Sequence, residues 1–226
     1  TARGVATDSS GNVYVTGYTT GGMDNNTSAG SYDTFLLKYN SSGTKQWTKQ
    51  LGTSGNDFAY GVATDSSANV YVTGYTEGGM DSNTSAGSFD IFVVKYDSSG
   101  TKQWTKQLGT AANDFAYGVV TDSSANVYVT GNTGGGLDGN SSAGSADIFV
   151  VKYNSSGTKQ WTKQLGTASV DAANGVSTDS SGNAYVTGNT TGGLDGNTSA
   201  GSTDIFVVKY NSSGTKQWTK QIGTLG

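Results

Sequence analysis

The sequence predicts an all-β fold built from four consecutive copies of one structural unit. Tryptophan marks the period, because Trp47, Trp104, Trp161 and Trp218 recur every 57 residues within closely similar surroundings. Such a period is typical of repeat architectures, in which neighbouring copies stack because one copy cannot bury its own apolar face. Composition agrees: the chain has 35 Gly, 13 Tyr and no Pro, and Glu77 is the single Glu among 17 acidic residues. This is a composition of strands and turns.

The second copy illustrates the expected elements in order. Its apolar and aromatic segments predict four strands, at residues 58–65, 69–76, 90–96 and 102–108. The Asp-Ser-Ser-Gly/Ala segments after the first and third strands supply the Asx and glycine residues of short hairpin turns. The third strand is almost wholly apolar, as expected for a sheet covered on both faces. The fourth carries lysines beside its tryptophan, as outermost strands often do to prevent edge-to-edge pairing.

Four short antiparallel strands per copy are the pattern of a β-propeller blade. The alternative is a stacked β-solenoid, although 57 residues with two hairpins are long for one solenoid coil. We expect one repeat domain over residues 1–226, because no linker separates the copies. Its four-stranded blades are expected at about 1–55, 56–112, 113–169 and 170–226.

Three segments carry a resemblance to a known family. Residues 4–17 read Gly-Val-Ala-Thr-Asp-Ser-Ser-Gly-Asn-Val-Tyr-Val-Thr-Gly, and residues 57–61 and 99–104 extend the match. They resemble the prokaryotic SBBP β-propeller repeat and, more distantly, NHL-type blades, in all four copies. The resemblance implies a secreted or surface-attached bacterial or archaeal protein, in a family whose molecular roles are mostly undefined. The family is associated with seven blades, whereas this chain has four.

Four blades leave the closure of the ring open. The chain can close into a four-bladed disc, two chains can form an eight-bladed ring, or the blades can be part of an open assembly. Terminal copies of an isolated array usually carry polar capping changes, and none is visible here. This favours closure or further assembly. The copies differ in pairs, with Tyr18 and Tyr75 in the first two and Asn132 and Asn189 in the others. Such drift favours a natural array over an engineered consensus scaffold.

A long loop between the second and third strands of each copy is the candidate metal site. In residues 22–33 oxygen-bearing side chains alternate and a carboxylate follows a glycine, which suits hard cations such as Ca²⁺. With two carboxylates per loop, we expect modest affinity. The predicted ligands in the four copies are Asp24, Asn26, Ser28 and Asp33; Asp81, Asn83, Ser85 and Asp90; Asp138, Asn140, Ser142 and Asp147; and Asp195, Asn197, Ser199 and Asp204.

The alternative interpretation is that these residues only cap turns through Asx and hydroxyl hydrogen bonds. The aspartates between blades are expected to bind backbone amides; these are Asp57, Asp114 and Asp171. Those in the first hairpin of each copy are expected to form turns; these are Asp8, Asp65, Asp122 and Asp179. Lys45 and Lys49 are expected to be solvated charges on the outer strand.

Composition excludes several classes of function. A net charge of −4 argues against nucleic acid and anionic membranes as partners. No apolar segment approaches the roughly 18 residues needed to span a bilayer. The chain has no His and no Cys, so it lacks an imidazole base, a thiol nucleophile and the usual zinc ligands. We therefore expect no enzymatic activity.

The sequence thus predicts an extracellular or cell-surface β-propeller repeat protein with a structural or adhesive role. Equivalent loops, stabilised by Ca²⁺, would make repeated weak contacts with an extracellular protein, a glycan or another copy. One alternative is a subunit of a surface fibre or layer. Another is a carbohydrate-active enzyme with an acidic cleft. The third is a designed symmetric scaffold without a ligand.

Overall fold

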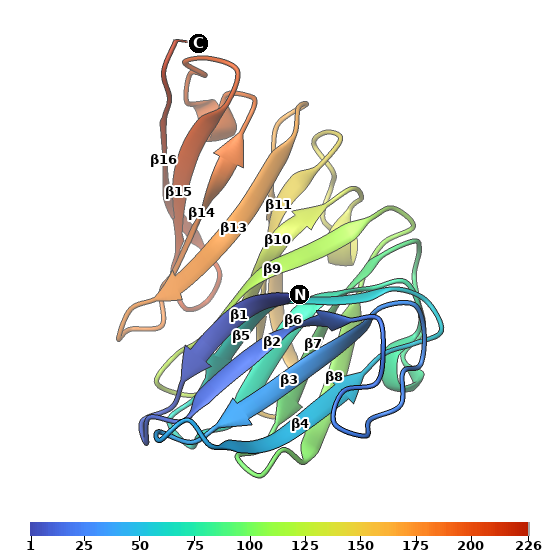
Figure 1. The fold of residues 1–226 in the computed structure, drawn as a ribbon. Helices are drawn as coiled ribbons and strands as arrows, with labels where there is room; N and C mark the ends of the chain where they lie inside the picture. The colour runs from blue at the N-terminus through green and yellow to red at the C-terminus, as the bar shows by residue number, and fades with distance from the viewer. Residues whose placement is uncertain (226) are drawn as a thin grey trace.

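The computed structural model describes residues 1–225 as four antiparallel sheets in chain order (Figure 1). The first sheet contains β1 (Ala2–Thr7), β2 (Val13–Thr19), β3 (Asp33–Tyr39) and β4 (Lys45–Leu51). The second contains β5 (Asp57–Thr64), β6 (Val70–Thr76), β7 (Asp90–Tyr96) and β8 (Lys102–Leu108). The third contains β9 (Asp114–Thr121), β10 (Val127–Thr133), β11 (Asp147–Tyr153) and β12 (Lys159–Leu165). The fourth contains β13 (Asp171–Thr178), β14 (Ala184–Thr190), β15 (Asp204–Tyr210) and β16 (Lys216–Ile222).

The first hairpin of each sheet turns on the aspartate that the sequence indicated. In the second sheet, Asp65 Oδ1 accepts hydrogen bonds from the backbone N–H groups of Ser67 and Asn69, both at 2.9 Å. Ala68 takes a positive φ of 58° there. The other oxygen of this carboxylate, Oδ2, accepts a hydrogen bond from the hydroxyl of Tyr71 at 2.9 Å. Tyr71 is fully buried, so this aspartate joins the turn to the core, a role that turn chemistry alone did not predict.

The core lies between the sheets. We call the side of a sheet that is turned towards the next sheet along the chain its leading face, and the opposite side its trailing face. Within residues 1–225, the trailing face of the first sheet and the leading face of the fourth have no neighbouring sheet. At the first junction, Tyr14 and Leu36 of the leading face meet Val72 and Phe92 of the next trailing face. Trp47 of the outer strand covers this cluster. The two other junctions repeat the arrangement with equivalent residues.

The first strands of neighbouring sheets lie side by side, which fixes how the sheets fan out (Figure 1). The hydroxyl of Thr64 donates to the carbonyl of Thr7 at 2.9 Å, and Thr121 and Thr178 continue the series onto the preceding sheet. Glycine permits the close approach: a Cβ on Gly61 would lie 3.0 Å from the carbonyl oxygen of Tyr117. The sheets therefore diverge from a common inner edge.

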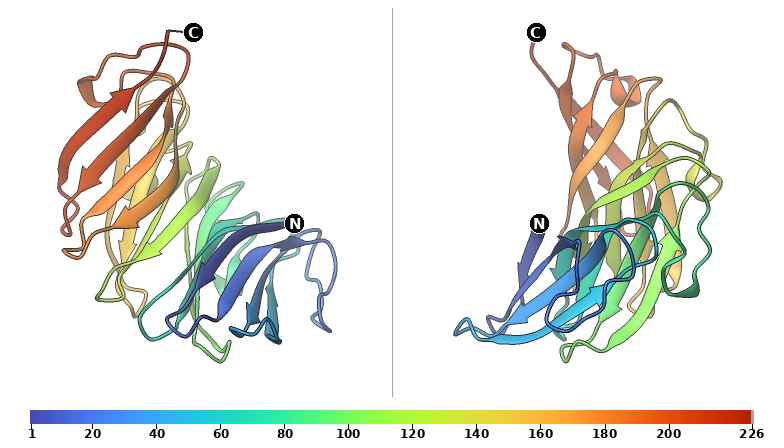
Figure 2. Two further views of the ribbon diagram at one scale, coloured as in Figure 1. Left: turned by 60° about the vertical axis from the view of Figure 1, so that its left-hand side comes forward. Right: turned by 45° about the vertical axis from the view of Figure 1, so that its right-hand side comes forward.

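The result is a propeller-like fold that confirms the predicted class. Over residues 1–225 the four sheets form an open arc, and Figure 2 shows the first and fourth sheets at its opposite ends. Of the closure alternatives, this structure is therefore not the closed four-bladed disc. The two remaining alternatives are an eight-bladed ring of two chains and an open assembly, and they differ in what covers the first and fourth sheets. None of the helical turns in the described part of the chain is long and apolar enough to cross a membrane.

Candidate functional site

The long loops fold alike in the last three copies. A short 3₁₀ turn opens each loop, at Met80–Ser82, Leu137–Gly139 and Leu194–Gly196. The first residue of each turn is a buried apolar anchor, and the aspartate after it takes a positive φ of 50–54°. Gln107 of the outer strand holds the loop in place: its Oε1 accepts the N–H of Met80 at 2.9 Å. Equivalent glutamines hold the other loops.

The first predicted metal ligand of each loop forms an ion pair with a lysine. Asp24 Oδ1 lies 2.5 Å from Lys45 Nζ, and both side chains are about two-fifths exposed, at 40% and 44%. The sequence predicted that Lys45 is a solvated charge, whereas in the structure it forms an ion pair with Asp24. The equivalent pairs are Asp81 with Lys102, Asp138 with Lys159, and Asp195 with Lys216. The hydrogen bond from Lys45 lowers the pKa of the Asp24 carboxyl below its usual range.

The second predicted aspartate of each loop is buried where the third strand begins. Asp90 Oδ2 accepts the N–H of Ala86 at 2.7 Å and the side-chain amide of Gln107 at 2.8 Å. The intervening predicted ligands bind locally: Asn83 donates to the carbonyl of Met80, and Ser85 to that of Gly87. Asp90 Oδ2, Asn83 and Ser85 thus have protein partners, as the turn-capping interpretation expected, whereas Oδ1 of Asp90, like that of Asp147 and Asp204, is buried without a hydrogen-bond partner. Among residues 1–225 no three His, Cys, Asp or Glu side chains form a group suited to a metal ion. Calcium binding by these loops stays a prediction.

Buried carboxylates also meet at the junctions between sheets. A Cβ placed on Gly52 would lie 2.2 Å from Asp33 Oδ1 and 3.0 Å from Asp57 Oδ2, so two carboxylates converge beside this glycine. As expected, the inter-blade aspartate binds backbone: Asp57 Oδ2 accepts the N–H of Thr53 at 2.6 Å. Burial raises the pKa of Asp57, and the charge of Asp33 raises it further. Both side chains are fully buried, so the pair joins neighbouring sheets and faces no solvent.

Within residues 1–225, an equivalent groove opens on the surface at each of the three junctions. Each has a volume of about 350–370 Å³. The first is lined by Lys49, Gln50 and Leu51 of one sheet and by Tyr96, Thr101 and Lys102 of the next. Residues shifted by one repeat line the second, including Lys106 and Lys159, and residues shifted by two line the third, including Lys163 and Lys216. We call these the junction grooves.

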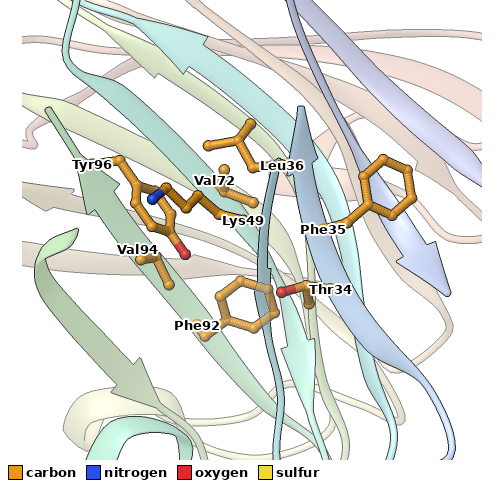
Figure 3. A pocket seen from close by; sticks show the side chains of 8 residues that line it. All are labelled: Thr34, Phe35, Leu36, Lys49, Val72, Phe92, Val94 and Tyr96. Carbon is orange, nitrogen blue, oxygen red and sulfur yellow. The ribbon is translucent and has the colours of Figure 1, made fainter. Parts of the chain in front are cut away.

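The chemistry of a junction groove combines an apolar wall with polar donors. Leu51 and Tyr96 supply the wall, and Lys49 and Lys102 supply ammonium groups. The side-chain amide of Gln50 is already bonded to Met23 and Asp33. Such a surface suits a ligand that presents hydroxyl, carbonyl or anionic oxygens beside apolar patches. Deeper in the same junction lies a cavity of only about 10 Å³, lined by Lys49 and Tyr96 together with core residues (Figure 3). It has room for about one water molecule, so it admits no larger ligand.

An aromatic cluster on the first three sheets breaks the symmetry of the repeats. Tyr75 lies at its centre, with ring centroids 5.3 Å from Phe58, 5.4 Å from Phe89 and 4.7 Å from Phe115. Burial raises the pKa of Tyr75. The members of the aromatic cluster are Tyr18, Tyr32, Phe58, Tyr60, Tyr75, Phe89, Phe115 and Tyr117.

The aromatic cluster coincides with positions at which the copies differ. Tyr75 corresponds to Asn132 and Asn189 in the later copies, and Phe115 to Ala172. The differences are visible in the sequence, but their contact in space is not, because the rings come from three sheets. Tyr18 and Tyr75 each pack against a phenylalanine ring of the following sheet, Phe58 and Phe115 respectively.

Comparisons with known proteins agree with this repeat architecture. The family described as SBBP, a beta-propeller repeat, matches residues 1–22, 46–79, 103–138 and 160–195. An uncharacterized WD repeat-containing protein of Acanthamoeba polyphaga mimivirus is 27% identical over 230 residues, covering 80% of this chain and 17% of the relative. The regulatory protein FlaEY of Caulobacter vibrioides is 26% identical over 195 residues, covering 77% and 20%. The chain thus spans a fifth or less of the length of these curated relatives.

Among solved structures, the crystal structure of a protein of unknown function from Bacteroides caccae aligns with 98% of this chain. The alignment covers 81% of that protein's chain, with a TM-score of 0.37 and 10% sequence identity.

Proposed function

Because this chain belongs to the SBBP β-propeller repeat family, we propose that it is an extracellular structural or adhesive protein that binds one partner at several equivalent places. The single observation that carries the proposal is the threefold recurrence of the junction groove, with the same residue types at each junction. A partner with a repeated surface, such as a polysaccharide or a protein lattice, can occupy several grooves at once. Its weak individual contacts then add up to a strong attachment.

The charges of the junction grooves favour a partner that carries acidic groups. Lys49 and Lys102 face the first groove, and the net charge of the whole chain is nevertheless −4. Lys102 already pairs with Asp81, so Lys49 and its equivalents are the ammonium groups that a ligand would meet first. An acidic polysaccharide supplies carboxylates on a polar backbone and fits this arrangement. The proposed role is binding, since each groove offers donors and apolar contact and no arrangement for proton transfer.

Retention on immobilised polysaccharides tests the proposal. We expect the protein to bind a uronic-acid polymer more tightly than a neutral polymer of the same length. Successive Lys49→Ala, Lys106→Ala and Lys163→Ala substitutions should each weaken binding, with more than a tenfold total loss. Lys220→Ala is the matched control at protein concentrations at which the chain is monomeric, because Lys220 holds the same repeat position on the last sheet, which then has no following sheet to complete a groove.

Two results would count against the proposal. One is equal retention on the acidic and the neutral polymer, and the other is an equal loss of binding in the Lys220→Ala control. The extracellular location has its own test, antibody labelling of intact cells that express the protein, in which we expect the surface to be stained without permeabilisation.

A further inference from the structure

The leading face of the fourth sheet exposes apolar residues whose equivalents on the second and third sheets are buried or half-buried at the junctions. Ile91 and Ile148 are each 1% exposed, whereas their equivalent Ile205 is 62% exposed. Ile222, at the position of Leu165 on the previous sheet, is 69% exposed. Trp218 and Val207 of the same face are also exposed. Contiguous apolar patches of this kind mark interaction surfaces.

The trailing face of the first sheet is uncovered in the same way. Val5 is 68% exposed, whereas its equivalent Val62 is half-buried against the first junction core. Val70 and Val72 of the second sheet are almost fully buried, and the matching valines of the first sheet are only half-buried. These two faces lie at opposite ends of the arc (Figure 2). Each therefore presents one half of a junction that the chain already builds three times.

A hollow on the fourth sheet marks where the missing half would sit. Its volume is about 450 Å³, and Gly175, Tyr185 and Val207 are among its lining residues. At the equivalent glycine of the first sheet, a Cβ on Gly4 would lie 3.3 Å from Val62 of the following sheet. At Gly175 such a Cβ would meet only Thr187 of its own sheet, at 3.6 Å. The hollow is thus the place that a following first strand occupies at the internal junctions.

Hydrogen bonds between sheets also recur at the internal junctions, and the two end faces carry the donors and the acceptor of one further such set. Lys152 donates to the carbonyl of Ser212 on the following sheet at 3.0 Å, and the indole N–H of Trp161 donates to the same oxygen at 3.2 Å. The equivalent donors on the fourth sheet are Lys209 and Trp218, and the equivalent acceptor on the first sheet is Ser41. The end faces therefore match in hydrogen bonds as well as in shape.

We propose that a second copy of this chain seats the trailing face of its first sheet on the leading face of the fourth sheet. The contact repeats the internal junction: Val5 of the second copy fills the hollow beside Gly175, Thr7 donates to the carbonyl of Thr178, and Lys209 donates to that of Ser41. The interface is head to tail, so it joins two different surfaces and propagates into either a closed ring or a longer array. It does not depend on what the junction grooves bind.

Sedimentation velocity of the purified chain over a hundredfold range of concentration tests the association. We expect a dimer or larger species that dissociates on dilution. A monomer at every concentration up to about 100 µM would overturn the proposal.

Two charge substitutions then test the geometry of the interface. I205D blocks the leading face and V5D blocks the trailing face, so each variant alone should be monomeric. Mixing them at high concentration leaves one intact pair of faces, so a 1:1 heterodimer should form. Ser123→Asp places the same charge on an exposed turn residue between β9 and β10, away from both faces, and should associate like the unmodified chain.

Far-ultraviolet circular dichroism of each variant separates loss of association from loss of folding. Folded variants that still associate alone, or a mixture that stays monomeric, would refute the head-to-tail contact. Association through some other surface would appear as self-association that both I205D and V5D leave intact.

Discussion

Asp90 occupies the space that a side chain on Gly109 would need. A Cβ on Gly109 would lie 1.9 Å from Asp90 Oδ1, while the other carboxylate oxygen of Asp90 is bound by Ala86 and Gln107. Gly166 and Gly223 meet their aspartates in the same way, at 1.9 and 1.7 Å. The residue after each outer strand must therefore be Gly, because the buried carboxylate leaves no space for a side chain there. The same carboxylate links the long loop and the outer strand to the third strand.

Replacing this glycine should destabilise the fold. We expect Gly109→Ala to lower the free energy of unfolding by about 1–3 kcal/mol, because the carboxylate is held on its other side and cannot yield without losing hydrogen bonds. Urea denaturation measures the effect. Gly21→Ala is the control, since no atom lies within 4 Å of a Cβ there. Equal stability of Gly109→Ala and the unmodified chain would contradict the packing described above.

The aromatic cluster should contribute stability that the later copies lack. Tyr75→Asn introduces the residue found at the equivalent Asn132. It removes four ring contacts with centroids within 5.4 Å, together with the hydroxyl hydrogen bond to Tyr60. We expect a loss of about 2–3 kcal/mol in urea denaturation. Asn189→Ala, which removes one hydrogen bond with Asn174, should cost only about 0.5–1.5 kcal/mol. A Tyr75→Asn effect no larger than that of Asn189→Ala would show that the rings make little net contribution.

The turn carboxylates should make the fold less stable in acid. Hydrogen bonds, the largest from the side chain of Asn183, lower the pKa of Asp179 from 3.8 to about 2. A pKa that is lower in the folded state means that the stabilisation is complete above about pH 4 and is lost as the pH falls towards 2. Asp179→Asn should therefore reduce the decrease in melting temperature between pH 4 and 2. An unchanged decrease would contradict this role.

The buried carboxylates at the junctions act in the opposite sense. Burial raises the pKa of Asp57 and Asp114, so these groups favour the folded state more when they are protonated. In the unmodified chain, protonation of Asp114 partly offsets the loss of stability in acid. Asp114→Asn removes this effect, so the melting temperature of the variant should fall further on acidification than that of the unmodified chain. The comparison with Asp179→Asn in the same buffers separates the two classes of aspartate.

Calcium should bind the long loops weakly if the predicted ligands hold it. Binding requires Lys45 to leave Asp24, which adds a competing interaction to a site with only two carboxylates. We expect dissociation constants of about 10⁻⁴–10⁻³ M, seen as a melting temperature that rises in millimolar calcium and returns with chelator. Asp24→Asn and its three equivalents should abolish the rise. A melting temperature that is independent of calcium would remove the hypothesis.

The local elements could be predicted from the sequence because they depend on nearby residues. The strand expected at 90–96 is observed as Asp90–Tyr96, and that at 102–108 as Lys102–Leu108. Asp65 forms the expected turn with residues two and four positions away. Period, turn chemistry and apolar runs all act within one hairpin, so a single copy already contains the information that forms its strands.

Relationships between distant residues were not predictable in the same way. The pairing of Asp24 with Lys45 spans 21 residues and depends on how the long loop folds back over the outer strand. The aromatic cluster joins three sheets, and the open arc depends on the angle between sheets. No periodic pattern encodes these features. The exposed Ile205 could not be distinguished in the sequence from the buried Ile148, since both stand in the same Asp-Ile-Phe-Val-Val segment.

The stacking of each sheet on its neighbours alone also sets the order in which the chain comes apart. β16 and β1 belong to sheets with one neighbour, whereas the second and third sheets have two. Amide protons of the end sheets should exchange with solvent sooner than those of β6 and β10, in proportion to the junctions that each opening breaks. Local stability is therefore expected to rise from the end sheets to the central sheets, so that unfolding starts at the ends of the arc. A partner that covers the end sheets would then slow unfolding of the whole chain.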